Sequence, residues 1–161
     1  MSGDTWPRRL GWTIVAVVAA DWTSKFMVTN HLAPNGKVAL VDGWLYFVRL
    51  SNAGVSFSML AGSHGAWRTP LLVILALLGI VALLHFSRSI PERGARFALA
   101  LVVAGATGNL GDRIVNGAVT DFLAIRWFPW VFNVADLAIT TGAVLLALQL
   151  LPARKRSDAV G

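Results

Sequence analysis

The sequence contains no cysteine and few charged residues. The absence of cysteine excludes disulfides, thiolate metal sites and a cysteine nucleophile. The three histidines (His31, His64 and His85) fall in three different regions, which argues against a histidine metal centre or a Ser-His-Asp triad. Charged residues make up only 14% of the chain and hydrophobic residues 56%, whereas a soluble domain is about a quarter charged. The composition therefore favours a membrane protein.

Four segments are apolar enough to cross a bilayer as helices, which takes roughly 20 residues each. The first is not typical of a cleaved signal peptide, because Asp21 and Lys25 interrupt it and no clear small-residue cleavage site follows. We therefore expect one integral membrane domain (residues 1–161), an all-α bundle of four transmembrane helices with a small β element. The expected spans are residues 10–29, 70–86, 97–114 and 130–151.

The net charge of +6 does not indicate nucleic-acid binding, because the basic residues are clustered. In a four-span chain the clusters all fall on the same side of the membrane, as the positive-inside rule requires. We therefore expect both termini to be cytoplasmic and anionic lipid headgroups, rather than nucleic acid, to be the partner. The clusters are Arg8–Arg9, Arg88–Arg96 and Arg154–Arg156.

The segment between the first two expected spans, residues 31–69, contains "KVALVDGWLYFVRLSNAGVSFSML". Its β-branched and aromatic residues are separated by turn signals at Asp42-Gly43 and Asn52-Ala53-Gly54, a pattern typical of short strands. We expect a small sheet on the outer, periplasmic face, with an irregular loop as the alternative. The second outer segment, residues 116–129, has aromatic residues that suit the membrane interface.

Polar residues recur at helical spacing within three of the expected spans. Polar side chains inside spans usually face the bundle interior and are functional candidates, although an ion pair that aids insertion or a packing seam would also explain individual sets. The sets are Asp21, Ser24 and Lys25; Gly105, Asn109 and Asp112, with Arg113 beside them; and Asn133, Asp136 and Thr140, with Asp121 just outside span three.

These polar groups share a depth in the membrane. At 1.5 Å per residue, Asp21 lies roughly 18 Å from Arg9 along the first span, and Asp112 lies roughly 22 Å from Phe97 along the third; both spans run outward. Asp136 lies roughly 9 Å below Trp130, which marks the outer rim of the fourth span. All of them, with Asp121, therefore gather in the outer half of the bilayer. We interpret them as one site.

Carboxylates dominate this set, and two carboxyl groups in a low-dielectric site share a proton. One then acts as a general base on water while the other donates a hydrogen bond to the carbonyl under attack. This is aspartic-protease chemistry, which needs no metal and no cofactor. Asp112 has Arg113 beside it and favours a structural ion pair, so Asp121 and Asp136 are the preferred pair; a pair that includes Asp112 remains an alternative.

Four blocks of the sequence resemble, in order, the motifs of bacterial lipoprotein signal peptidase (signal peptidase II). The resemblance covers nearly the whole chain, including the four-span layout. The chain departs from the usual pattern at Trp22, Ala104 and Thr120, where the family more often has Gln, Gly and Val; none of these positions is a carboxylate, so the departures concern packing and substrate fit rather than the reaction. The blocks are "DWTSK" (21–25), "NAGVSFSML" (52–60), "AGATGNLGDRIVNGAVTDF" (104–122) and "FNVADLAI" (132–139).

The resemblance implies a multi-pass aspartic endopeptidase of the bacterial inner membrane whose active site faces the periplasm. Such enzymes cleave prolipoproteins on the amino side of a diacylglyceryl-modified cysteine, and globomycin inhibits them. By motif position, Asp121 and Asp136 match the catalytic pair. A lipidated substrate would also need a side opening between helices, which Gly105 and Gly108 would permit.

Other motif positions match supporting roles. Those that surround the catalytic pair and hold the substrate backbone are Asn52, Asn109, Arg113 and Asn133, with Gly54 as a turn glycine. Those with a structural role are Asp21, Lys25 and Asp112.

Two other classes of function compete with this interpretation. A small proton-coupled transporter would use Asp21, Asp112 and Asp136 as a relay, but it predicts charges spread across the membrane and often an internal repeat. A scaffold subunit would use the polar residues to hold helices together. Substitutions of its aspartates would then lower stability rather than turnover.

Overall fold

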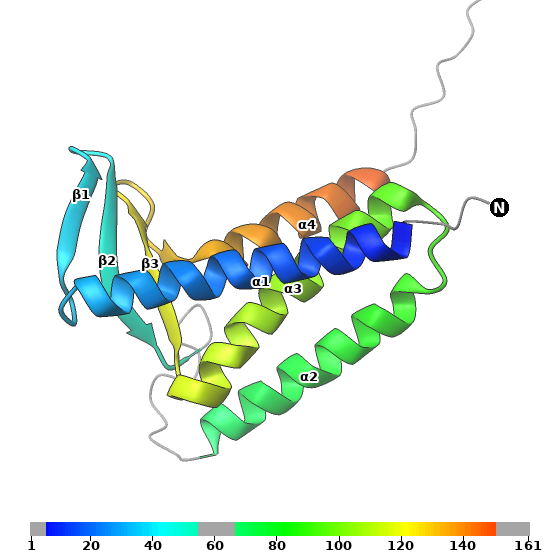
Figure 1. Cartoon of the computed structure of the whole chain (residues 1–161), viewed down its shortest axis with the longest axis horizontal. Helices are drawn as coiled ribbons and strands as arrows, with labels where there is room; N and C mark the ends of the chain where they lie inside the picture. The colour runs from blue at the N-terminus through cyan, green and yellow to red at the C-terminus, as the bar shows by residue number, and fades with distance from the viewer. Residues whose placement is uncertain (1–5, 55–66, 151–161) are drawn as a thin grey trace, which may run out of the picture.

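The computed structural model describes residues 6–54 and 67–150, which form four helices and one small antiparallel sheet (Figure 1). The expected mostly helical fold with a small β element is confirmed at this level. Residues 55–66 of the expected β-rich segment, His64 and the Arg154–Arg156 cluster lie outside the described residues. The helices are α1 (Trp6–His31), α2 (Arg68–Ser87), α3 (Arg93–Asn116) and α4 (Val134–Leu150); the strands are β1 (Lys37–Val41), β2 (Leu45–Asn52), β3 (Val119–Ile125) and β4 (Val131–Phe132).

The start of α4 differs from the expected fourth span. That span was predicted to begin at Trp130, whereas Val131 and Phe132 pair with β3 and the helix begins at Val134. Asn133 stands between β4 and α4 and forms a reciprocal cap with Asp136. The Asn133 Oδ1 accepts the backbone N–H of Asp136 at 2.9 Å, and the Asp136 carboxylate accepts the backbone N–H of Asn133 at 3.2 Å. Such paired bonds satisfy N–H groups that a helix start otherwise leaves unpaired.

Helix α3 is central and packs against α1, α2 and α4. Its glycines allow close approach: a Cβ at Gly105 would overlap the backbone carbonyl of Ala135, and one at Gly108 would lie 2.6 Å from the Asp21 carboxylate. These two glycines therefore lie in closed α3–α4 and α3–α1 contacts. The side opening expected at Gly105 and Gly108 is not found there.

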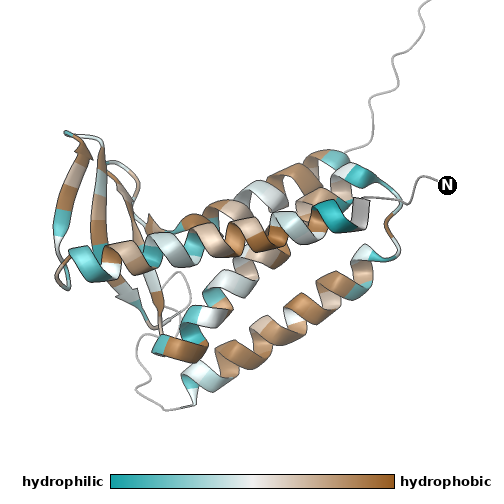
Figure 2. Cartoon of the chain, in the orientation of Figure 1, coloured by the Kyte–Doolittle hydropathy of each residue, from teal (hydrophilic) through white to brown (hydrophobic). Residues whose placement is uncertain are grey.

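Two helices in the described residues, α2 and α3, are long and apolar enough to cross a bilayer, while the apolar helix α4 is shorter. Figure 2 shows α2 as hydrophobic along nearly its whole length. None of its residues is buried, and large side chains such as Leu78 and Val81 are more than 60% exposed. A helix with such exposure is suited to contact with lipid.

The sheet lies at one end of the helices, with strand order β1-β2-β3-β4 and antiparallel pairing throughout (Figure 1). Strands β3 and β4 come from the segment between α3 and α4, where an outer loop without strands was expected. The inward-facing residues of β3 include Val119 and Asp121, and Phe122 is also buried. A carboxylate at a buried position conceals the alternation of apolar residues by which strands are identified.

Arg49 on β2 joins the sheet to the end of α1. Its Nη1 donates to the carbonyl oxygens of Thr29 at 2.8 Å and Leu32 at 3.0 Å. The cation therefore satisfies carbonyl groups that the end of a helix leaves unpaired, where a positive charge is also favourable.

Replacing Arg49 by Met should therefore lower the free energy of unfolding by about 1.5–3 kcal/mol, because hydrogen bonds from a charged donor are lost. Thermal unfolding in detergent measures the effect. Arg126→Met is the matched control: Arg126 is exposed, and its bond to Gly43 O is long at 3.4 Å. Equal losses in the two variants would show that Arg49 does not tie the sheet to α1.

Candidate active site

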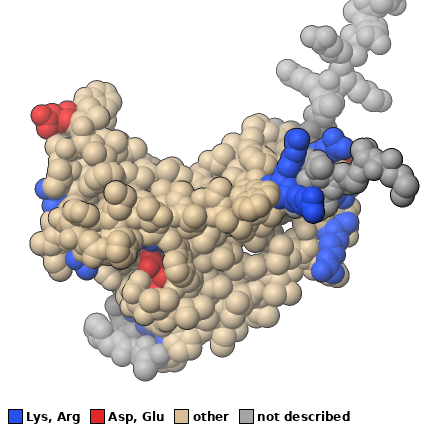
Figure 3. Space-filling model, in the orientation of Figure 1, with Lys and Arg blue, Asp and Glu red and all other residues tan. Residues whose placement is uncertain are grey.

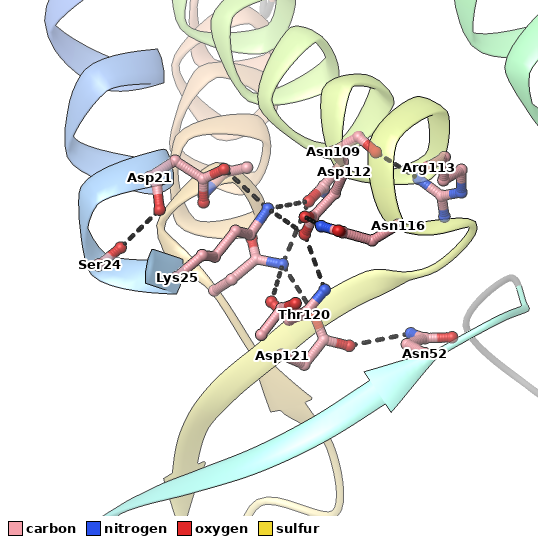
Figure 4. Close-up of polar contacts among 12 residues, drawn as sticks. Asp21, Ser24, Lys25, Asn52, Asn109, Asp112, Arg113, Asn116, Thr120 and Asp121 are labelled. Carbon is pink, nitrogen blue, oxygen red and sulfur yellow. Dashed lines mark hydrogen bonds and ion pairs between the residues drawn. The ribbon is translucent and has the colours of Figure 1, made fainter. Parts of the chain in front are cut away.

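Buried polar side chains meet where α1, α3 and α4 reach the sheet (Figure 4). They come from elements far apart in the sequence, so the predicted convergence of polar residues is found in the fold. Their burial requires that each be hydrogen-bonded or paired with an opposite charge. The buried members are Asp21, Lys25, Asn109, Asp112, Asp121 and Asn133.

Asp121 lies on β3 and is only 3% exposed. Its two carboxylate oxygens accept hydrogen bonds from amide nitrogens, Asn133 Nδ2 at 2.7 Å and Asn52 Nδ2 at 2.9 Å. Burial, and to a smaller extent the nearby charge of Asp136, raise the pKa of Asp121, while the two amide bonds lower it; the net result is a pKa of about 6. Asp121 can therefore exchange a proton close to neutral pH.

Asp136 lies in the first turn of α4 and is half-buried. Its Oδ1 accepts Asn109 Nδ2 at 2.8 Å, and its Oδ2 accepts the Asn133 backbone N–H. Because Asn133 also donates its side-chain amide to Asp121, a single residue contacts both carboxylates. The two candidate catalytic groups therefore share one site, and the short turn at Asn133 joins them.

Lys25 and Asn133 together determine how the Asn109 side chain is oriented, because Asn133 Nδ2 also donates to Asn109 Oδ1 at 3.1 Å. The Lys25 Nζ lies 2.7 Å from Asp21 Oδ2, 3.2 Å from Asp112 Oδ2 and 3.1 Å from Asn109 Oδ1. An ammonium group can only donate, so the Asn109 atom that faces it must be the oxygen. The amide nitrogen of Asn109 then points to Asp136. Sequence reasoning gave Lys25 only a structural role and did not reveal this link.

Asp112 forms its ion pair with Lys25, so the expected partner, Arg113, was wrong. Neighbouring residues on a helix do not face each other, whereas α1 brings Lys25 directly opposite. The remaining acceptor capacity of Asp112 is used by the backbone N–H of Thr120 and by Asn116 Nδ2, both at 2.8 Å. Sequence reasoning missed Asn116, although its spacing of four residues from Asp112 was a usable signal.

Asp21 connects α1 to the start of α4. Its Oδ1 accepts the backbone N–H of Ala135 at 2.9 Å, and its other oxygen pairs with Lys25. A carboxylate is stabilised at the N-terminus of a helix. Asp21 and Asp112 thus hold the surrounding segments in place with Lys25 between them (Figure 4). Within the described residues, their carboxylates accept hydrogen bonds from Ala135, Asn116 and Thr120 rather than contacting Asp121 or Asp136.

Arg113 and Gly54 lie beside the site. Arg113 donates to the carbonyl oxygens of Asn109 at 3.3 Å and Gly54 at 3.5 Å. The backbone N–H of Gly54 donates to Asn52 Oδ1 at 3.1 Å, which leaves the Asn52 nitrogen to face Asp121. The residues that follow Gly54 lie outside the described part of the chain.

The described residues contain no cluster of three or more side chains suited to hold a metal ion. A pocket with a volume of about 460 Å³ is lined by Trp22, Lys25, Asp112 and Thr120, among others, but not by Asp121 or Asp136. The Trp22 ring lies against Gly111, where a Cβ would overlap it. The unusual Trp22 therefore forms part of a wall of this pocket, away from the two candidate catalytic groups.

Comparisons with known proteins cover nearly the whole chain. The family described as signal peptidase (SPase) II matches residues 13–152. The lipoprotein signal peptidase of Pseudomonas syringae pv. tomato is 35% identical over 156 residues, which cover 92% of this chain and 89% of the relative. The lipoprotein signal peptidase of Pseudomonas aeruginosa PAO1 is 36% identical over 155 residues, which cover 92% of this chain and 90% of the relative.

Two solved structures, both described as a bacterial membrane enzyme, share the fold. One has a TM-score of 0.81 at 24% identity and covers 95% of this chain and 94% of its own. The other has a TM-score of 0.82 at 23% identity and covers 89% of this chain and 93% of its own.

Proposed function

The chain belongs to the signal peptidase II family, and we propose that it is an aspartic endopeptidase that removes the signal peptide from diacylglyceryl-modified prolipoproteins. Curated relatives are lipoprotein signal peptidases, so a peptidase acting on lipoprotein precursors is the function that the comparisons support. They do not favour the alternative of a proton-coupled transporter.

The observation that carries the catalytic proposal is the contact of Asn133 with both Asp121 and Asp136. In the proposed reaction Asp136 takes a proton from water as the oxygen attacks the scissile carbonyl carbon. Asp121, with its raised pKa, carries the shared proton and donates it to the carbonyl oxygen. As the tetrahedral intermediate collapses and the C–N bond breaks, Asp136 passes its proton to the leaving amine and a hydroxyl of the intermediate returns a proton to Asp121.

The hydrogen-bonding neighbours of the dyad have supporting roles in this proposal. Asn109 orients Asp136, Asn133 spaces the two carboxylates, and Asn52 orients Asp121. Arg113 and the turn at Gly54 border the same space and would bind the substrate backbone. No step requires a metal or a cofactor.

The proposed membrane placement is a four-span topology in the bacterial inner membrane, with both termini cytoplasmic. Figure 3 shows Lys and Arg side chains gathered at the end of the helices remote from the sheet, which supports a periplasmic sheet under the positive-inside rule. The dyad then lies near the outer interface. The acyl chains of the substrate can remain in lipid while the scissile bond meets water from the periplasm.

A cleavage assay on a defined precursor tests this function. The purified protein should shorten a diacylglyceryl-modified prolipoprotein, as seen by gel shift, and leave the unmodified precursor intact. Globomycin should block the reaction. Proton-coupled flux in proteoliposomes without any cleavage would refute the proposal and support the transporter.

The pH dependence of kcat/KM should follow the ionisation of Asp121. Its pKa is raised, so the carboxyl is protonated at low pH, and the acid required by the mechanism is lost as pH rises through about 6. We expect kcat/KM to fall about tenfold per pH unit above that point. Asn52→Ala removes a bond that lowers the pKa of Asp121, so the falling limb should move to higher pH.

The control for this experiment is Asn30→Ala, which removes the same amide from an exposed position on α1. Its pH profile should match that of the unmodified protein. A limb that stays in place or moves to lower pH in Asn52→Ala would show that Asp121 does not carry the proton.

A further inference from the structure

A second pocket lies at the other end of the helices, between α1, α2 and α3. Its volume is about 340 Å³, within the range of roughly 300–1,000 Å³ that is typical of small-molecule sites. Its walls are apolar: Leu10 and Ile14 come from α1, Leu84 from α2, and Leu99 and Val103 from α3. We call this space, with the arginines described next, the arginine groove.

Two arginines, Arg88 and Arg96, also line the arginine groove. Arg96 is half-buried, and its Nε donates to the carbonyl oxygen of Ile90 at 2.5 Å, which holds the guanidinium in place. Within residues 6–54 and 67–150, neither arginine has a carboxylate at ion-pair distance. Glu92, the acidic residue of the α2–α3 connection, is exposed. The groove therefore combines an apolar interior with two cations that lack a protein counter-charge in the described part of the chain.

Helix α2 packs against α3. Figure 1 shows α2 nearest to α1 at the end remote from the sheet, which is where the groove lies, and separating from α1 toward the sheet. Figure 3 shows basic side chains gathered at this end of the molecule. Exposing apolar walls to water is unfavourable in proportion to their area. An occupant that is itself apolar over most of its length would cover these walls.

We propose that the arginine groove binds an anionic phospholipid, with its phosphate between Arg88 and Arg96 and one acyl chain along Leu84 and Ile14. Guanidinium groups bind phosphate oxygens through paired hydrogen bonds. Basic pockets between membrane helices on the cytoplasmic side are suited to such headgroups. The apolar walls distinguish a lipid from free phosphate, which would leave them uncovered.

The arginine groove is separate from the active site. Arg96 and Asn109 lie on the same helix, and thirteen residues separate them by roughly 20 Å along its axis. Lipid binding here therefore does not rest on the proposed peptidase reaction. Peptidase activity can fail while the lipid still binds, and the reverse also holds.

Native mass spectrometry of the full chain released from detergent tests the proposal, with dioleoyl-phosphatidylglycerol and dioleoyl-phosphatidylcholine as probes. The unmodified protein should retain the anionic lipid with a preference of roughly 10- to 30-fold, given the effect of two arginines near an anionic headgroup. Arg88→Gln with Arg96→Gln should remove this preference. Leu84→Trp, which keeps both arginines but fills the groove from an exposed position, should lower retention of the anionic lipid as well.

The matched control is Lys37→Gln with Arg126→Gln, which removes the same two charges at the sheet end. It should keep the preference. The proposal is overturned if the unmodified protein shows no preference, or if the control loses it to the same extent, because net charge alone would then explain retention. Inorganic phosphate at millimolar concentration should not displace the lipid; displacement would indicate an anion site without an acyl chain.

Discussion

Asp121→Asn and Asp136→Asn should each reduce prolipoprotein cleavage by about 10²–10⁴-fold, the usual contribution of a positioned proton-transfer group. An amide has nearly the shape of a carboxyl group but can neither accept the proton of water nor supply the shared proton. The loss should appear in kcat, measured by single-turnover cleavage of a diacylglyceryl-modified precursor. It should appear in both variants, because the mechanism needs one carboxyl group in each protonation state.

The fold should survive these two substitutions. Asn at position 121 retains an oxygen that can accept one of its two amide donors, from Asn133 or Asn52. The thermal midpoint in detergent should therefore change by only a few degrees, about 1 kcal/mol per lost hydrogen bond. Asp42→Asn makes the same chemical change at an exposed position between β1 and β2 and should leave cleavage unaltered. A normal cleavage rate in either dyad variant would refute the assignment.

Lys25→Met should produce the largest loss of stability. Lys25 is 4% exposed and neutralises both Asp21 and Asp112. Removing one partner of a buried ion pair leaves an uncompensated charge and costs about 3–5 kcal/mol. Unfolding of the purified protein in detergent measures this loss. Lys37→Met, at an exposed lysine on β1, should cost far less.

The triple variant Asp21→Asn, Lys25→Met and Asp112→Asn separates two roles of Lys25. It removes all three charges together, so most of the lost stability should return. Activity should remain at least about tenfold low, because the Asn109 oxygen then keeps only the donor from Asn133, and the proposed catalytic carboxylate of Asp136 is less well oriented. Full recovery of kcat with stability would show that Lys25 acts only on the fold.

The sequence predicted three of the helices well and the fourth only in part. Long apolar runs marked the interiors of α1, α2 and α3, while α4 begins at Val134 rather than Trp130. The error arises because hydropathy does not distinguish a short apolar strand from the first turn of a helix. The Asn133 cap, which decides the boundary, depends on a reciprocal bond with Asp136 that becomes evident only in the folded backbone.

The gathering of polar residues was predictable because helical spacing and depth depend only on sequence and topology. Their pairing was not. Lys25 binds Asp112 through the packing of α1 on α3, and no local pattern reports which residue of one helix faces which residue of another. The strand that carries Asp121 was missed for a related reason, since a buried carboxylate stands where an apolar residue would complete the pattern.

The reciprocal cap at Asn133 couples the positions of the Asp121 and Asp136 carboxylates to the first turn of α4. Fraying of that turn would release the backbone bonds of Asn133 and Asp136 together, and with them the amide that holds Asp121. Partial loosening would then abolish the proposed activity rather than leave the site active with a misplaced acid.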